Sequence, residues 1–144
     1  MSVLEVRRLR THLRTPFGVA RAVDGVDLTV EEGEAVGIVG ESGSGKSLLA
    51  LSILGLVPRG IGESLPGSSI RFRGRDLVGA GKKTLRRVRG GEVAMVFQEP
   101  MTSLNPVLTL GTQVLEAVAL HRGLAGRPAE EEATRLLGEV GIPE

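Results

Sequence analysis

Apolar and polar residues alternate along the first thirty positions of the chain. Leu4 and Val6, and later Val26, Leu28 and Val30, are each separated by one polar residue. A period of two is typical of half-buried β-strands. We therefore expect strands joined by turns over residues 3–30, followed by a turn at EEGE, residues 31–34.

Two short apolar runs predict a second kind of strand. Residues 35–39 (AVGIV) and 93–97 (VAMVF) are uninterrupted and have turn-forming residues on both sides, as expected of strands buried on both faces of a parallel sheet. The first run leads into the glycine-rich GESGSGKS, residues 40–47, and then into LLALSILGLV. We expect a buried helix over residues 46–57, ended by Pro58.

The rest of the chain divides into a loop, a short strand, a basic segment and helices. Residues 59–69 are rich in Gly, Ser and Pro and predict a loop, and residues 70–73 (IRFR) alternate as in an edge strand. Residues 82–89 carry five positive charges and no acid; we favour a solvated surface over a site for nucleic acid or lipid. Helical spacing then appears twice, in Leu110, Gln113, Val114, Ala117, Val118 and His121, and in Ala133, Leu136, Leu137 and Val140 after Pro128.

Composition excludes several classes of protein. The chain has 144 residues, 41% of them hydrophobic, which fits one globular domain, and 18 Lys plus Arg against 17 Asp plus Glu leave a net charge of +1. That charge gives no general attraction to nucleic acid, so no nucleic-acid partner is expected. The absence of cysteine excludes disulfides and thiolate metal sites. The longest apolar run, residues 48–57, is about half of the roughly 20 residues that a membrane helix needs.

Residues 40–47 match the pattern G-x-x-x-x-G-K-[ST], and the composition gives such a match a chance frequency of roughly 0.7%. Gly40, Gly43 and Gly45 lack Cβ atoms and can take positive φ values, so several backbone N–H groups can converge on one anion. The following helix adds donors and the positive end of its dipole. Lys46 would reach the β- and γ-phosphate oxygens, and the Ser47 hydroxyl would bind Mg²⁺. The pattern predicts a site for a nucleoside triphosphate with magnesium.

Four segments in this order and spacing resemble the ATP-binding subunits of ABC transporters, most closely the dipeptide/oligopeptide permease group. They are AVDGVDL (22–28), GEAVGIVGESGSGKSLLALSILGLVP (33–58), IRFRGRDL (70–77) and VAMVFQEPMTSLNP (93–106). The resemblance implies an α/β fold: a partial P-loop core with an antiparallel β subdomain over residues 1–98, and the start of a helical subdomain over residues 99–144.

The same resemblance assigns roles to two further residues. Phe17 takes the place of an aromatic that stacks on adenine, with ordinary packing as the alternative, and Gln98 takes that of a glutamine contacting Mg²⁺ and the attacking water, with a solvated turn as the alternative. Phe72 and Phe97 are expected in the core. The full set of candidates is Phe17, Gly40, Glu41, Ser42, Gly43, Ser44, Gly45, Lys46, Ser47 and Leu48 for ATP, Ser47 and Gln98 for Mg²⁺, and Lys46 and Gln98 for catalysis.

The family implies an energy-coupling ATPase at the cytoplasmic face of the plasma membrane. Two such subunits enclose two ATP molecules and drive import of peptides or similar solutes through transmembrane permease subunits. A solute-binding protein delivers the solute to the permease. We find no LSGGQ-like signature, no apolar strand ending in Asp-Glu and no switch histidine in the 144 residues. We therefore expect a truncated nucleotide-binding domain, and hydrolysis by this chain alone is not expected.

Three other functions are compatible with parts of the pattern. The chain could be a nucleotide-binding module that does not hydrolyse ATP. It could be half of a DNA-repair or chromosome-structure ATPase, but Gly123, Gly126 and Pro128 interrupt the long heptads that those proteins need. Small GTPases and nucleotide kinases share the loop at residues 40–47, but they do not need the glutamine strand that ends at Gln98.

Overall fold

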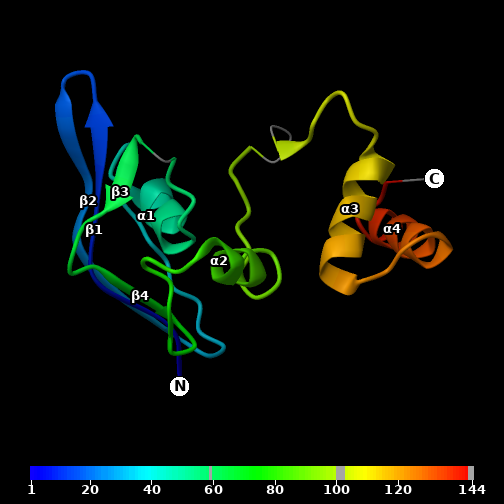
Figure 1. Ribbon diagram of the computed structural model, residues 1–144, viewed down its shortest axis with the longest axis horizontal. Helices are drawn as coiled ribbons and strands as arrows, with labels where there is room; N and C mark the ends of the chain where they lie inside the picture. Colours follow the sequence, from blue (N-terminus) through cyan, green and yellow to red (C-terminus); the bar gives the residue numbers. More distant parts are fainter. Residues whose placement is uncertain (59, 100–102, 143–144) are drawn as a thin grey trace. The chain divides into compact units, whose positions relative to one another are not determined.

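A computed structural model describes residues 1–58, 60–99 and 103–142 of the chain. These residues form two compact units, Met1–Val93 and Ala94–Glu144. The first unit is built on a long antiparallel hairpin of β1 (Ser2–Thr15) and β2 (Gly18–Glu31), with only residues 16 and 17 between the strands (Figure 1). The strands predicted over residues 3–30 are confirmed. Of the alternating residues, Val6 is buried, and Leu4, Val26, Leu28 and Val30 are half-buried.

Three short strands extend the sheet beyond β1. β3 (Gly62–Ser64) pairs with one end of β1 and β4 (Ser69–Phe72) with the other, and β5 (Arg75–Asp76) pairs with β4; every pairing is antiparallel. β3 lies within the segment that the sequence predicts to be a loop. Ile70 and Phe72 of β4 are buried while Arg71 is exposed, so the alternation predicted a half-buried strand correctly.

Helix α1 (Lys46–Ile53) packs on this sheet and closes the core of the first unit. It begins where the sequence predicts and ends four residues earlier. Gly55, with φ 61°, stops it, because its N–H donates to Ser52 O at 3.0 Å and Leu56 N–H donates to Leu51 O at 2.8 Å, the two bonds of a Schellman motif. The buried core consists of Val6, Leu9, Val23, Leu49, Ile70, Phe72, Leu77 and Val88, the last from α2 (Lys82–Val88).

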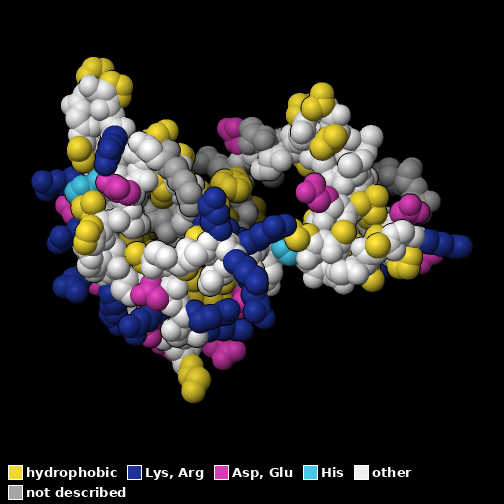
Figure 2. Space-filling view, viewed as in Figure 1, with side chains coloured by type: hydrophobic (Ala, Val, Ile, Leu, Met, Phe, Trp, Pro, Cys, Tyr) yellow, Lys and Arg dark blue, Asp and Glu magenta, His cyan; other side chains and the backbone are white. Residues whose placement is uncertain are grey.

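The basic residues of α2 lie on the surface. Lys82, Lys83, Arg86 and Arg87 are exposed, whereas Leu85 and Val88 turn towards the core. Figure 2 shows many Lys and Arg side chains on the visible face of the first unit. The favoured interpretation of this segment, a solvated basic surface, agrees with these exposures.

The two apolar runs that predict doubly buried strands do not form strands in the structure. Residues 35–39 are all exposed, with Val39 at 94% exposure, and no strand of the described chain pairs with them. In residues 93–97 only Val93 makes a bridge, to Arg89, and Phe97 is 45% exposed instead of lying in the core. A parallel strand has buried faces only when neighbouring strands and helices cover it, and the described residues supply no such neighbours.

The second unit is a pair of packed helices, α3 (Leu110–Arg122) and α4 (Arg127–Glu139), as the helical spacing predicts. Its core contains Val118, Ala129 and Ala133, with Val114, Leu115, Leu124 and Leu136 packed around them. Thr109 caps α3 by accepting from Thr112 N–H at 3.2 Å, and Pro128 lies in the first turn of α4. Val140, expected on the apolar face of α4, is exposed because the helix has already ended.

An ion-pair network joins the two helices of this unit. Glu132 of α4 forms an ion pair with Arg122 of α3, with 2.6 Å between Oε1 and Nη1, and accepts a hydrogen bond from Arg135 Nε at 2.8 Å. The hydrogen bond from Arg135, followed by the charges of Arg122 and Arg135, holds the pKa of the Glu132 carboxyl below its usual value despite partial desolvation. Ionised Glu132 therefore stabilises the packing of α4 on α3.

Candidate nucleotide-binding site

The glycine-rich loop before α1 is held close to strand β2. Gly43 and Gly45 have φ values of 81° and 92°, a region that L side chains rarely adopt. A Cβ atom at Gly45 would lie 2.2 Å from the carbonyl oxygen of Ala22, and one at Gly40 would lie 2.8 Å from Ser44 Oγ. Gly40 itself is not in the positive-φ region, so the lack of a side chain, and not φ, explains glycine there.

The ammonium group of Lys46 lies across the mouth of this loop. Its Nζ donates to Gly40 O at 2.8 Å, to Glu41 O at 2.7 Å and to Ser44 Oγ at 3.2 Å. The loop is further closed by a turn in which Ser44 N–H donates to Glu41 O at 3.2 Å. One positive charge is therefore held by neutral oxygens at the position where the sequence predicts a phosphate contact.

The first turn of α1 presents uncapped N–H groups to the loop. Gly45 is the N-cap, no side chain caps the helix, and its first turn contains no acidic residue. The bond from Leu49 N–H to Gly45 O at 2.8 Å is the first of the helix, so Lys46, Ser47 and Leu48 precede it and have no acceptor one turn back. These donors and the helix dipole favour an anion at this end.

Residue exposure separates the roles that Ser47 and Leu48 can play. The side chain of Ser47 is exposed, so its hydroxyl is accessible to a ligand or a metal ion. Leu48 is half-buried and its side chain packs against the core, whereas its backbone N–H belongs to the uncapped first turn of α1. Glu41 and Ser42, at the outer side of the loop, are exposed.

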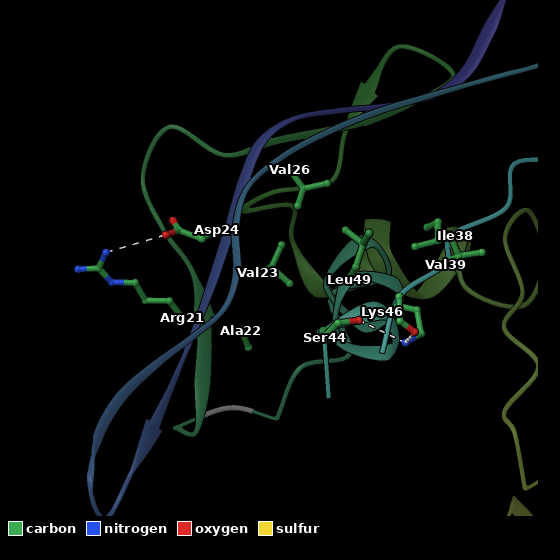
Figure 3. Close-up of a pocket in the computed structure, with 12 residues that line it drawn as sticks. Arg21, Ala22, Val23, Asp24, Val26, Ile38, Val39, Ser44, Lys46 and Leu49 are labelled. Carbon is green, nitrogen blue, oxygen red and sulfur yellow. Dashed lines mark hydrogen bonds and ion pairs between the residues drawn. The ribbon is translucent and has the colours of Figure 1, made fainter. Parts of the chain in front are cut away.

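A cavity of about 460 Å³ lies between the loop, α1 and strand β2. Figure 3 shows Val23 and Val26 of β2 on the same side as Leu49, while Arg21 and Asp24 form an ion pair on the opposite side of the strand. The lining is Arg21, Ala22, Val23, Asp24, Val26, Ile38, Val39, Gly40, Ser44, Gly45, Lys46 and Leu49. The loop pattern gives no signal for the β2 residues; the tight approach of Gly45 to Ala22 is what brings them to the site.

Of the predicted site residues, Gly40, Ser44, Gly45 and Lys46 line this cavity. The others in the loop and at the helix start do not line it: Glu41, Ser42, Gly43, Ser47 and Leu48. Two predicted residues, Phe17 and Gln98, belong to neither the loop nor α1. Phe17 is at the turn of the β1–β2 hairpin, its side chain is fully exposed, and it does not line the cavity. Packing in a core therefore does not account for an aromatic residue at position 17. Gln98 is exposed and belongs to the second unit. The contacts of both residues with a nucleotide or Mg²⁺ stay predictions.

A protein-family model described as ABC transporter matches residues 23–144. The chain belongs to the ABC transporter family. A Brucella melitensis biotype 1 protein named as a peptide import ATP-binding protein is 47% identical over 147 residues, covering 99% of this chain and 43% of that protein. A protein of the same description from Brucella abortus strain 2308 is 48% identical over 142 residues, covering 99% and 42%. The chain thus spans less than half the length of the relatives that it matches.

Solved structures confirm the fold expected of this ABC chain. A dimeric ATP-binding cassette in a post-hydrolysis state, bound to ADP and phosphate, superposes with a TM-score of 0.76 at 23% identity, over 94% of this chain and 56% of that one. A second dimeric structure of that cassette, described as a bacterial ABC transporter cassette, gives a TM-score of 0.72 over the same shares. The chain therefore has the fold of a partial P-loop core of the ABC type.

Proposed function

We propose that the chain forms the phosphate-binding part of an ATP-binding subunit in an ABC importer for peptides or similar solutes. The observation that supports this most strongly is the arrangement around α1: a loop with positive φ at Gly43 and Gly45, uncapped N–H donors, and the Lys46 ammonium, all at one end of a helix. Family membership and the names of the Brucella relatives agree with it.

The residues of the loop fit the chemistry of a triphosphate. Loop N–H groups and those of the first turn of α1 would bind phosphate oxygens, and Lys46 would exchange its three neutral acceptors for charged ones, which form stronger hydrogen bonds. Gly45 leaves no room for a side chain beside the backbone of Ala22, and a Cβ at Gly40 would displace the Ser44 hydroxyl. The apolar residues Val23, Val26 and Leu49 would exclude water beside the phosphates.

Magnesium would be held mainly by the nucleotide. Among the described residues there is no group of three or more His, Cys, Asp or Glu side chains that could hold a metal ion. The exposed Ser47 hydroxyl would supply one oxygen and the phosphates the others, as Mg²⁺ bound with nucleotides requires. When bound, the ion neutralises phosphate charge. We propose Gln98 as a second Mg²⁺ contact that also orients the attacking water.

The partners follow from the family and not from this chain's own contacts. We propose a second ATPase subunit that completes the ATP site, transmembrane permease subunits, and a location at the cytoplasmic face of the inner membrane. No helix in the described part of the chain is long and apolar enough to cross a membrane.

Titration with Mg-ATP tests the central claim. Lys46→Ala should weaken binding by roughly tenfold to a hundredfold, the effect of losing one or two charge-assisted hydrogen bonds. Lys83→Ala is the matched control because Lys83 is an exposed lysine of α2 and its loss changes the net charge equally. Equal dissociation constants for wild type and Lys46→Ala would refute the assignment. Phosphate release in the presence of the partner subunit, lost in Lys46→Ala, would extend it to hydrolysis.

A further inference from the structure

Arg89 reaches the C-terminal end of α1, the helix that begins at the phosphate-binding loop. Its Nε donates to Leu54 O at 2.7 Å and its Nη2 donates to Gly55 O at 2.6 Å. The residue is half-buried, in contrast to the exposed Arg86 and Arg87 of the adjoining helix. One planar guanidinium therefore binds two consecutive carbonyl groups in a fixed geometry.

These two bonds add to the hydrogen bonding at the end of α1. The Schellman motif satisfies Leu51 O and Ser52 O, and Leu54 N–H donates to Ala50 O at 3.3 Å. Leu54 is the C-cap residue and Gly55 follows it, and the carbonyl oxygens of both accept from Arg89. The last turn of α1 contains no basic residue of its own, so Arg89 supplies the positive charge that favours this negative end of the helix dipole.

The backbone makes room for this contact. Gly55 has φ 61°, and a Cβ atom there would lie 3.0 Å from Arg89 Nη2. Arg89 N–H donates to Leu85 O at 2.9 Å, and Arg89 bridges to Val93, where Gly90 N–H donates to Val93 O at 2.8 Å. Arg89 thus connects α2, the end of α1 and the last residue of the first unit.

Helix α1 is short enough for its two ends to move together. It has eight residues, a length of about 12 Å at 1.5 Å per residue. A shift of its C-terminal end therefore tilts the N-terminal turn that carries Lys46 and the uncapped N–H groups. Gly45 lies against Ala22 O with no space for a Cβ, and Leu49 is buried in the core. The start of α1 therefore rests on strand β2, and Arg89 adds a restraint at the opposite end of the helix.

We propose that Arg89 is a positioning residue for phosphate binding: by fixing the C-terminal end of α1, it sets the direction in which the helix start faces the phosphates. This inference rests on the proposed function. Arg89 touches no nucleotide. Its role is to restrain a helix, and a flexible lysine with a single ammonium would restrain it less well than the guanidinium fork does.

The test combines hydrogen exchange with nucleotide titration on wild type, Arg89→Ala, Arg89→Lys and Arg87→Ala. Arg87→Ala is the control because it removes the same charge from an exposed position two residues away. In Arg89→Ala, amide exchange should accelerate over residues 40–53 and stay unchanged in the β1–β2 hairpin. Its affinity for Mg-ATP and for Mg-pyrophosphate should fall equally, by roughly three- to tenfold, the effect of misplacing one hydrogen-bonding group. Arg89→Lys should be intermediate and Arg87→Ala unchanged.

At a temperature where every variant is folded, a general loss of stability would leave both affinities unchanged. An equal loss of affinity for ATP and for pyrophosphate therefore places the effect at the phosphates, which both ligands share. Unchanged exchange over residues 40–53, or unchanged affinity in Arg89→Ala, would overturn the inference. If Arg89→Ala does not fold, Arg89→Lys decides by the same criteria. Lys46→Ala in the same titrations tests the proposed function itself. If Lys46→Ala loses the binding seen in wild type while Arg89→Ala keeps it, only the role of Arg89 is refuted. If wild type does not bind, both proposals are refuted.

Discussion

Replacing Gly45 by alanine tests whether the phosphate loop is packed rigidly on strand β2. The new Cβ atom would be 2.2 Å from Ala22 O and 3.4 Å from Ala22 C, on a backbone with φ 92°. Both obstacles belong to the main chain of a paired strand, which cannot rotate away as a side chain would. Either the start of α1 or residue 22 must move.

Gly43→Ala separates the two contributions to this cost. Gly43 also has positive φ, 81°, but a Cβ there would meet no atom within 4 Å. We expect Gly43→Ala to lower the free energy of unfolding by about 1–2 kcal/mol, the cost of a left-handed conformation for an L residue. Gly45→Ala should add about 1–3 kcal/mol of steric overlap, because neither neighbouring atom can yield cheaply.

Hydrogen exchange of peptides from the β1–β2 hairpin in increasing urea measures the free energy of unfolding of the first unit alone, free of signal from α3 and α4. The same two variants should differ in Mg-ATP affinity, with the larger loss in Gly45→Ala because the start of α1 is displaced. If Gly45→Ala is no less stable than Gly43→Ala, the contact between loop and strand is not a rigid one, and the geometric argument for the site fails.

Three further predictions concern the supports of the two units. Ser52 Oγ donates to Leu48 O at 2.6 Å and so accepts from the fully buried Thr11 hydroxyl at 2.8 Å. Ser52→Ala leaves that hydroxyl without a partner and should lower the free energy of unfolding, measured in urea, by about 1–3 kcal/mol. This is several times the effect expected for Thr11→Val. The lowered pKa of Glu132 means that its stabilisation of α4 on α3 is present above the ordinary glutamate range and is lost as pH falls through the lowered pKa. Wild type should unfold at higher urea than Glu132→Gln at pH 7, and the difference should shrink as the pH is lowered below the ordinary glutamate range. Gln113→Ala should speed amide exchange at Asn105, whose N–H donates to Gln113 Oε1 at 2.8 Å; unchanged exchange there would show that this bond does not order the loop.

Local pattern predicted the elements whose partners are near in sequence. The β1–β2 hairpin needs only a two-residue turn, and α3 and α4 need only each other, so period and end signals were sufficient. Gln113 interrupts the apolar stripe of α3. Its amide donates to Asn105 O and Leu108 O, and these hydrogen bonds hold the preceding loop against the helix. A hydrogen bond of this kind is invisible to hydrophobic periodicity.

The loop at residues 40–47 was identified from residue types, because positive φ and a missing Cβ are properties of glycine itself. The β2 residues that line the cavity were not, since their place depends on a tertiary approach between Gly45 and Ala22. The strands expected at residues 35–39 and 93–97 failed for a related reason: a continuous apolar run describes a buried strand but does not contain the neighbours that bury it. The sequence presents Arg89 as one of five surface charges, whereas its guanidinium donates to two carbonyl groups at the C-terminal end of α1.

The exposed position of Phe17 has a practical use in spectroscopy. The chain contains no tryptophan and no tyrosine, so its intrinsic fluorescence is almost nil. Because the ring of Phe17 projects from the hairpin turn without packing against any core, an indole can replace it at little structural cost. Phe17→Trp would place the sole emitter at the point predicted to meet the base, so quenching by adenosine could be read separately from events at the phosphates.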